Sequence, residues 1–309
     1  MIQEDLNTTE QAIIKTLLYF DIFRHPLTGS ELSNSLQSEN PGPEILRTCL
    51  TKLTNSGLLR TSGDYLLLNG NEQYIRFRKE GNRRAERFMR RSRLFRELIA
   101  TAPFVRGIFM TGSISKGVVP EKGDVDYFII TRSGRLWICR TLLILFKKIF
   151  LFNSRKYFCL NYFVDEDHLE VAEKNLFTAT EVAFAIPLFN TELTRRFFTV
   201  NQWYRTYYPN MPGVNQRLVS KRQWHPLKVL AEALLSGKFG GKIEKWCYRK
   251  TCGHWAQKYK NMEPLMFDLN FRSYSHISKH HPHGFQFRVL QAYQQKIEEF
   301  EDRYKLHLS

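Results

Sequence analysis

The segments TGSISKG (residues 111–117) and GDVDYFII (residues 123–130) decide the fold, and the apolar run FVRGIFM (residues 104–110) precedes them. The apolar runs predict two buried strands, with a Gly-Ser turn at the end of the first. Side chains alternate between the two faces of a strand, so Asp124 and Asp126 are expected to project to the same side. The pattern therefore predicts a pair of carboxylates beside a glycine turn.

These residue types predict a metal and phosphate site. Two buried carboxylates repel each other and lose hydration unless a cation satisfies them. Carboxylate oxygens suit Mg²⁺, which shares its coordination sphere with waters and substrate phosphates. Glycine lets the backbone approach a phosphate, and a serine hydroxyl with the following amides donates hydrogen bonds to it. We therefore predict Asp124 and Asp126 as metal ligands, and Gly112, Ser113 and Lys116 as phosphate-binding residues; the resemblance described next implies that the phosphates are those of a nucleotide. The alternative is a surface hairpin with two solvated aspartates.

The spacing of these residues resembles the signature of the DNA polymerase β-like nucleotidyltransferase superfamily. That signature is a Gly-Ser or Gly-Gly pair, a short interval, and an acid-hydrophobe-acid triplet, matched here by Gly112, Ser113, Asp124 and Asp126. The resemblance covers about residues 87–171. It implies a mixed sheet with flanking helices and a Mg²⁺-dependent transfer of a nucleoside monophosphate from a nucleoside triphosphate (NTP). The acceptor is left open: a small molecule, a protein side chain or a nucleic acid.

The sequence departs from the superfamily at its third acidic position. The resemblance implies a carboxylate inside the third strand, which is expected at residues 157–164, but the matching residue is Asn161. Asparagine accepts a hydrogen bond but cannot act as a general base. Asp165, Glu166 and Asp167 follow closely and are alternatives for the missing role. The substitution leaves a second hypothesis open, in which the chain is a catalytically degenerate nucleotide sensor or a DNA-binding regulator.

The N-terminal region resembles a winged helix-turn-helix module. Helices are expected at residues 8–20, after Leu27, and between Pro43 and Gly57, and a hairpin is expected at residues 58–68. Capping-box spacings at Thr8…Gln11 and Thr28…Glu31 support the first two helices. The third helix offers only Arg47 and Lys52 as cations on its exposed face, which is a weak footprint for DNA. A protein-binding or interdomain role is the alternative.

The remaining chain is predicted to be helical apart from the strands above. We divide it into a module at residues 1–72, a basic linker helix at 73–101, an α+β core at 102–175 and a C-terminal helical domain at 176–309. Within the core, a helix is expected at residues 136–150, before the third strand. Two helices are expected at residues 178–189 and 192–208.

The chain is basic, with 46 Lys and Arg against 30 Asp and Glu among 309 residues, a net charge of +16. Such a charge favours polyanionic partners. Ten cations and two acids lie between Arg76 and Arg96, and the candidates for binding nucleic acid or another polyanion are Arg83, Arg84, Arg87, Arg90 and Arg91. The alternative is a solvated outer face of the linker helix.

Cysteine usage and hydropathy bear on the compartment. Five cysteines in a chain of this length do not form a disulfide framework, which favours a reducing environment. The polar start MIQEDLNTTE predicts no secretory signal. The most apolar stretch, residues 136–152, contains three cations and is short for a membrane span. A cytoplasmic protein without membrane insertion is expected.

Overall fold

A six-stranded mixed sheet forms the centre of the molecule, which is seen here in a computed structural model that describes residues 6–68, 71–214, 219–220, 225–281 and 284–308. The order of strands across the sheet is β7 (Ile186–Phe189), β4 (Val105–Thr111), β5 (Asp126–Thr131), β6 (Cys159–Asp165), β9 (Ile277–Lys279) and β8 (Ser273–Tyr274). The β5–β6 pair is parallel and the other pairs are antiparallel. The expected α+β class is confirmed.

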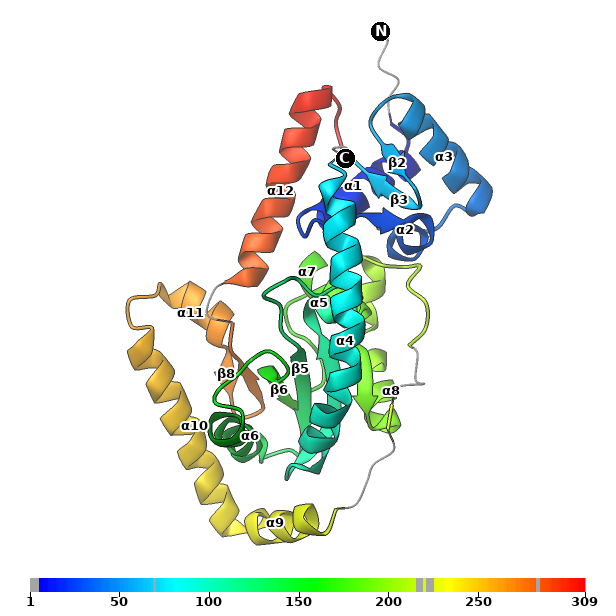
Figure 1. Cartoon of the computed structure of the whole chain (residues 1–309). Helices are drawn as coiled ribbons and strands as arrows, with labels where there is room; N and C mark the ends of the chain where they lie inside the picture. The colour runs from blue at the N-terminus through cyan, green and yellow to red at the C-terminus, as the bar shows by residue number, and fades with distance from the viewer. Residues whose placement is uncertain (1–5, 69–70, 215–218, 221–224, 282–283, 309) are drawn as a thin grey trace.

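Helices cover both faces of this sheet (Figure 1). On one face, Phe109 and Phe128 contact Phe197 of α8 (Thr191–Val200), with ring centroids 4.7 and 5.3 Å apart. This face also packs against α7 (Leu176–Ala183) and the 3₁₀ helix η1 (Gln202–Thr206). The opposite face packs against α4 (Gln73–Thr101), α6 (Leu136–Phe150) and α10 (Lys238–Lys258). The apolar strands are therefore buried between two helical layers.

The N-terminal module contains α1 (Thr8–Asp21), α2 (Gly29–Ser35), α3 (Pro43–Asn55) and a small antiparallel sheet. In that sheet β3 (Tyr65–Leu67) lies between β1 (Leu27–Thr28) and β2 (Arg60–Ser62). The Thr28–Glu31 capping box is present. The first capping box differs from the prediction, because Asn7 and Glu10 form it. Asn7 is itself a favourable N-cap residue and lies one position before Thr8.

The two ends of the chain pack together. The last helix, α12 (Phe285–Tyr304), lies beside α1, where Tyr293 and Tyr19 have ring centroids 5.5 Å apart and Lys296 pairs with Asp21. Figure 1 shows α12 and the N-terminal module at one end of the molecule and α9 (Pro226–Ser236) at the opposite end. Helix α4, the expected linker helix, runs between these two ends.

The region after residue 175 is less helical than the predicted C-terminal helical domain, because β7, β8 and β9 all join the central sheet. The expected helix at residues 178–189 ends at Ala183, and β7 begins at Ile186. Pro187 accounts for this difference, because proline disfavours helical geometry in the residue before it. The remaining helix of this region is α11 (Pro264–Phe271). The helices of the described residues include none with the length and apolar character needed to cross a bilayer.

Candidate active site

The predicted site residues meet at one end of the central sheet. Strand β4 ends at Thr111, which pairs with Asp126 at the start of β5, and Asp126 pairs in turn with Cys159 at the start of β6. Gly112 begins the short helix α5 (Gly112–Ser115) directly after β4. Asp124 lies two residues before β5, in the loop that leads into the strand. The antiparallel and parallel pairings thus bring three separate segments to the same end of the sheet.

Gly112 lies against the carboxylate of Asp126. Its φ angle is +72°, and a Cβ at this position would overlap Oδ2 of Asp126. A side chain is disfavoured here on both counts, because L residues rarely adopt this conformation and the space is occupied. The glycine of the Gly-Ser pair therefore lets the turn after β4 approach the second aspartate of the triplet.

Asp124, Asp126 and Cys159 form a potential ligand cluster, with one ligand atom of each lying within 4.8 Å of the others. Burial, followed by the negative charges of Asp124 and Glu181, raises the pKa of Asp126 to about 7. A cation between the two carboxylates would stabilise their charged forms and lower the pKa of Asp126 again. Within the part of the chain that the structure describes, this cluster is the one group of three or more His, Cys, Asp or Glu residues with such a geometry.

The donor set fits a hard divalent cation through its oxygen atoms. Carboxylates suit Mg²⁺, whereas a thiolate suits softer metals. Burial, together with the nearby Asp126, raises the pKa of Cys159, so the thiol keeps its proton. The sulfur lies 3.2 Å from Oδ1 of Asn161, to which it donates a hydrogen bond. The carboxylates of Asp124 and Asp126 are therefore the better ligands of this cluster.

Asn161 contacts the carboxylate pair directly. Its Nδ2 atom donates a 2.6 Å hydrogen bond to Oδ1 of Asp126. The β5–β6 register shifts at this point, because Tyr127 pairs with Leu160 while Phe128 pairs with Tyr162, which leaves Asn161 as the extra residue. Bulges of this kind redirect a side chain, often next to a functional site. The structure thus brings Asn161 to the position beside Asp126.

Lys116 forms an ion pair with Glu181, a residue that was not predicted from the sequence. Its Nζ atom donates to Oε1 of Glu181 at 2.8 Å and to the carbonyl oxygen of Gly112 at 3.0 Å. The other carboxylate oxygen of Glu181 accepts the backbone N–H of Gly112 at 2.9 Å. Burial opposes the charge of Glu181, but Lys116 and the Gly112 amide hold its pKa below the usual value. Glu181 of α7 therefore fixes both ends of the Gly112–Lys116 turn.

The hydroxyl of Ser113 lies in the same turn. Ser113 is half-buried, and its side chain makes no hydrogen bond with any residue that the structure describes. The first amides of a helix also have no partner within the helix. The Gly112 amide is occupied by Glu181, and the Lys116 amide donates to the carbonyl oxygen of Ser113. The donors left at this turn are therefore the Ser113 hydroxyl and the first amides after Gly112.

The three acids after Asn161 do not belong to this site, which corrects one alternative from the sequence. Asp165 pairs with Thr131, at the opposite end of β5 and β6 from Asp126 and Cys159. Six residues of strand correspond to about 20 Å. Asp165 accepts hydrogen bonds from the amides of Asp167 and His168 and closes a turn.

The arginines of α4 lie beside the site without entering it. Four of the five candidates are exposed: Arg83, Arg87, Arg90 and Arg91. Arg84 is half-buried, and its Nε atom donates to the carbonyl oxygen of Val119 at 2.8 Å. Val119 also donates its N–H to Gly81, so α4 supports the loop that leads to Asp124. Arg91 also contacts the protein, because it donates to the hydroxyl of Tyr157 at 2.7 Å. Two of the arginines therefore have contacts within the protein, and Arg83, Arg87 and Arg90 form an exposed basic face.

Two members of the site were missed in the sequence. Cys159 lies two residues before Asn161, and the alternation of a strand provided a signal for their common side. Glu181 follows Asp126 by more than fifty residues on another element, and no local spacing connects it to the site.

Comparison of the chain with models of known protein families, with curated proteins and with solved structures gave no match. The geometry and chemistry of the site are therefore what indicates a function.

Proposed function

We propose that the chain is a metal-dependent nucleotidyltransferase, built on a nucleotidyltransferase-like core with an N-terminal winged-helix-like module. The reaction would transfer a nucleoside monophosphate from an NTP to an acceptor and release pyrophosphate. The observation that carries this proposal is the contact between Gly112 and the carboxylate of Asp126, with Asp124 beside it. A phosphate-binding turn and a pair of metal-binding carboxylates are thereby held together at one end of the sheet.

Each residue of the site would have a separate role in this reaction. Asp124 and Asp126 would hold Mg²⁺, which when bound neutralises charge on the phosphates and orients the reacting groups. The Ser113 hydroxyl and the adjacent amides would bind phosphate oxygens. Glu181 and Lys116 keep the turn in place through their contacts with Gly112. Asn161 orients the Asp126 carboxylate through its hydrogen bond.

Asn161 also supports a second candidate function. It contacts Asp126 where the resemblance implies a carboxylate, and an amide cannot accept the proton of an attacking hydroxyl. In this alternative the chain binds an NTP with Mg²⁺ without turning it over and acts as a sensor. A DNA-binding regulator would instead use the exposed face of α3, where Arg47 is available and Lys52 pairs with Glu10 at 3.5 Å.

Binding and turnover experiments separate these functions. The enzyme should bind at least one NTP in a Mg²⁺-dependent manner and release pyrophosphate when supplied with acceptor pools, and Asp126→Asn should abolish both. A sensor should show the same binding without pyrophosphate release. The absence of NTP binding with and without Mg²⁺ would contradict both proposals. The regulator should instead retain labelled duplex DNA, with a strong dependence on salt concentration.

A further inference from the structure

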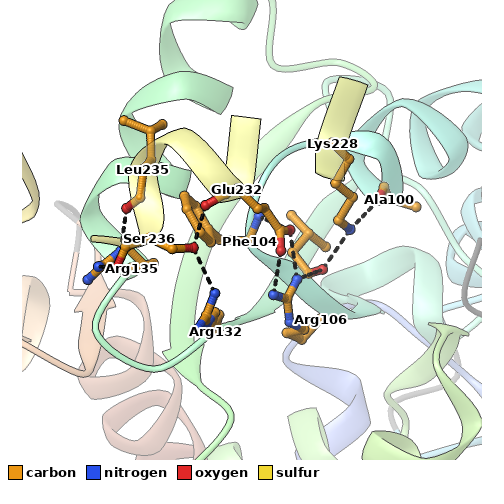
Figure 2. A network of polar contacts seen from close by, with 10 residues as sticks. Ala100, Phe104, Arg106, Arg132, Arg135, Lys228, Glu232, Leu235 and Ser236 are labelled. Atoms are coloured by element: carbon orange, nitrogen blue, oxygen red, sulfur yellow. Dashed lines mark hydrogen bonds and ion pairs between the residues drawn. The ribbon is translucent and has the colours of Figure 1, made fainter. Parts of the chain in front are cut away.

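Helix α9 is attached to the rest of the molecule through its polar side (Figure 2). Lys228 donates from Nζ to the carbonyl oxygens of Ala100 and Val105, at 2.7 and 2.8 Å. Glu232 accepts the N–H of Phe104 at 2.7 Å and forms an ion pair with Arg106, also at 2.7 Å. The inward side of α9 is therefore held by charged groups that are fully used within the protein.

The outward side of α9 is apolar. Leu227, Leu230 and Leu234 are 69%, 58% and 68% exposed. At about 100° per residue, these three leucines share one side of the helix, and Lys228 and Glu232 lie on the other. A surface helix ordinarily buries its apolar stripe and exposes its polar one. Helix α9 shows the reverse arrangement, and its leucines are left uncovered by the part of the chain that the structure describes.

Helix α10 begins directly after α9, at Lys238, and exposes large side chains of its own. Phe239 and Trp246 are 67% and 57% exposed, and Lys242 and Arg249 share their side of the helix at spacings of three and seven residues. The exposed cations of this part of α10 are Lys238, Lys242, Lys245, Arg249 and Lys250. The result is a mixed stripe of aromatic and basic side chains.

No free carboxylate accompanies these cations. Residues 225–262, all of which the structure describes, contain two acids, Glu232 and Glu244. Glu232 is paired with Arg106, and Glu244 is buried where it accepts the N–H groups of Trp137 and Ile138 at 2.7 and 2.8 Å. The outer face of α9 and α10 is therefore both apolar and purely cationic.

We propose that this outer face (Leu227, Leu230, Leu234, Phe239, Trp246 and the neighbouring cations) adsorbs to the surface of an anionic lipid bilayer. Leucine and phenylalanine side chains enter the boundary between headgroups and acyl chains, tryptophan favours the interface, and lysine and arginine attract anionic headgroups. A nucleic acid would match the cations but not the leucine stripe. A second copy of this face would bring like charges together.

The surface is separate from the candidate active site. Helix α9 contacts Val105, the first residue of β4, whereas the site lies after Thr111 at its other end. Seven residues of strand span about 20 Å. Adsorption through α9 would therefore leave the site uncovered, and the proposal stands independently of the proposed reaction.

Vesicle flotation of the full chain tests the proposal. The protein should float with phosphatidylcholine vesicles that contain about 30 mol% phosphatidylserine, remain unbound with phosphatidylcholine alone, and be partly released by salt. Replacing the three leucines (Leu227→Ser, Leu230→Ser, Leu234→Ser) should weaken binding about tenfold or more, through lost apolar insertion. Leu94→Ser is the matched control, because Leu94 is 78% exposed on α4. It should bind as the parent does.

Melting temperatures of all variants report whether they fold. Should the triple variant fail to fold, Trp246→Ser and the pair Lys242→Gln with Arg249→Gln provide the same test on α10, and each should reduce flotation severalfold. Absence of flotation with the anionic vesicles would overturn the proposal, as would equal flotation of parent and folded variants. Retention of a labelled oligonucleotide without vesicle flotation would assign the cations to nucleic acid and overturn it as well.

Discussion

The amide of Asn161 donates a 2.6 Å hydrogen bond from Nδ2 to Oδ1 of Asp126, so the neutral side chain supports the carboxylate that it faces. A donor at this position stabilises the charged form of Asp126 without adding negative charge. The residue that departs from the acidic pattern is therefore built into the site. Its replacement by an acid has opposite effects with and without metal.

Asn161→Asp is expected to destabilise the metal-free protein. The change removes a donor and adds a third carboxylate next to Asp124 and Asp126, at a cost of about 1–3 kcal/mol in the free energy of unfolding. The added oxygen ligand should enlarge the stabilisation by Mg²⁺. Urea unfolding with EDTA and with Mg²⁺ measures both effects, and a Mg²⁺ response equal to that of the parent would place Asn161 outside the metal site.

Gly112→Ala is expected to disrupt the site more than a typical glycine substitution. The new Cβ would overlap Oδ2 of Asp126, and the φ angle of +72° is unfavourable for alanine. Gly117→Ala is a matched control, because Gly117 has φ +71° with no atom within 4 Å of its Cβ position. The control isolates a conformational cost of about 1 kcal/mol. Gly112→Ala should cost more and should weaken NTP binding, whereas equal costs would show that the close approach to Asp126 has no energetic weight.

Glu181→Gln and Lys116→Met are expected to be coupled. The ion pair at 2.8 Å is largely buried, and each single change leaves the other charge without its partner. A double-mutant cycle on the free energy of unfolding should give a coupling of about 1–3 kcal/mol. Additive effects would show that the pair does not hold the turn. Glu170→Gln with Lys174→Met provides an exposed comparison pair, which should couple by less than about 1 kcal/mol.

The stability of the metal-free protein should depend on pH through Asp126. Its folded pKa of about 7 lies above the ordinary value, so the folded state binds the proton more tightly than the unfolded state. The contribution of this group is therefore greatest at acid pH and declines as pH rises from about 4 to about 7. Asp126→Asn does not titrate, and its stability relative to the parent should increase over that range.

The comparison with Asp126→Asn is needed because buried histidines act in the opposite direction. Burial and nearby cations lower the pKa values of His280 and His281. The contribution of these two groups to the stability of the folded protein therefore decreases as pH falls. They are present in both proteins and cancel in the difference. Thermal unfolding in EDTA from pH 5 to pH 8 is the measurement. A difference between parent and Asp126→Asn that stays constant with pH would contradict the raised pKa.

Local patterns were sufficient for much of the fold. The helices at residues 73–101 and 136–150 have the expected bounds, because long periodic stretches specify a helix without reference to the rest of the chain. Strands β4 and β5 were predicted because each is an apolar run next to turn residues. In contrast, β7, β8 and β9 are short strands at the two sides of the sheet, and their pairing depends on the already formed sheet.

The site was predictable in part for the same reason. Gly112, Asp124 and Asp126 lie within fifteen residues, so their spacing alone indicated a shared site. Glu181 reaches the turn through the packing of α7 on the sheet, which is a long-range property. The inverted polarity of α9 was also unpredictable, because its leucine pattern resembles that of any helix that buries one face.

Binding of Mn²⁺, which shares the preference of Mg²⁺ for oxygen ligands, tests the central claim most directly. Electron paramagnetic resonance would count the ions bound per chain in the presence of a non-hydrolysable NTP analogue, in the parent, Asp124→Asn, Asp126→Asn and the far-end control Asp167→Asn. We expect Mn²⁺ that is displaced by Mg²⁺ in the parent and in Asp167→Asn, with affinity about tenfold or more lower in the two site variants. Equal Mn²⁺ affinity in all four proteins, or no Mn²⁺ bound beyond that held by the free analogue, would contradict the assignment of Asp124 and Asp126 as the metal ligands.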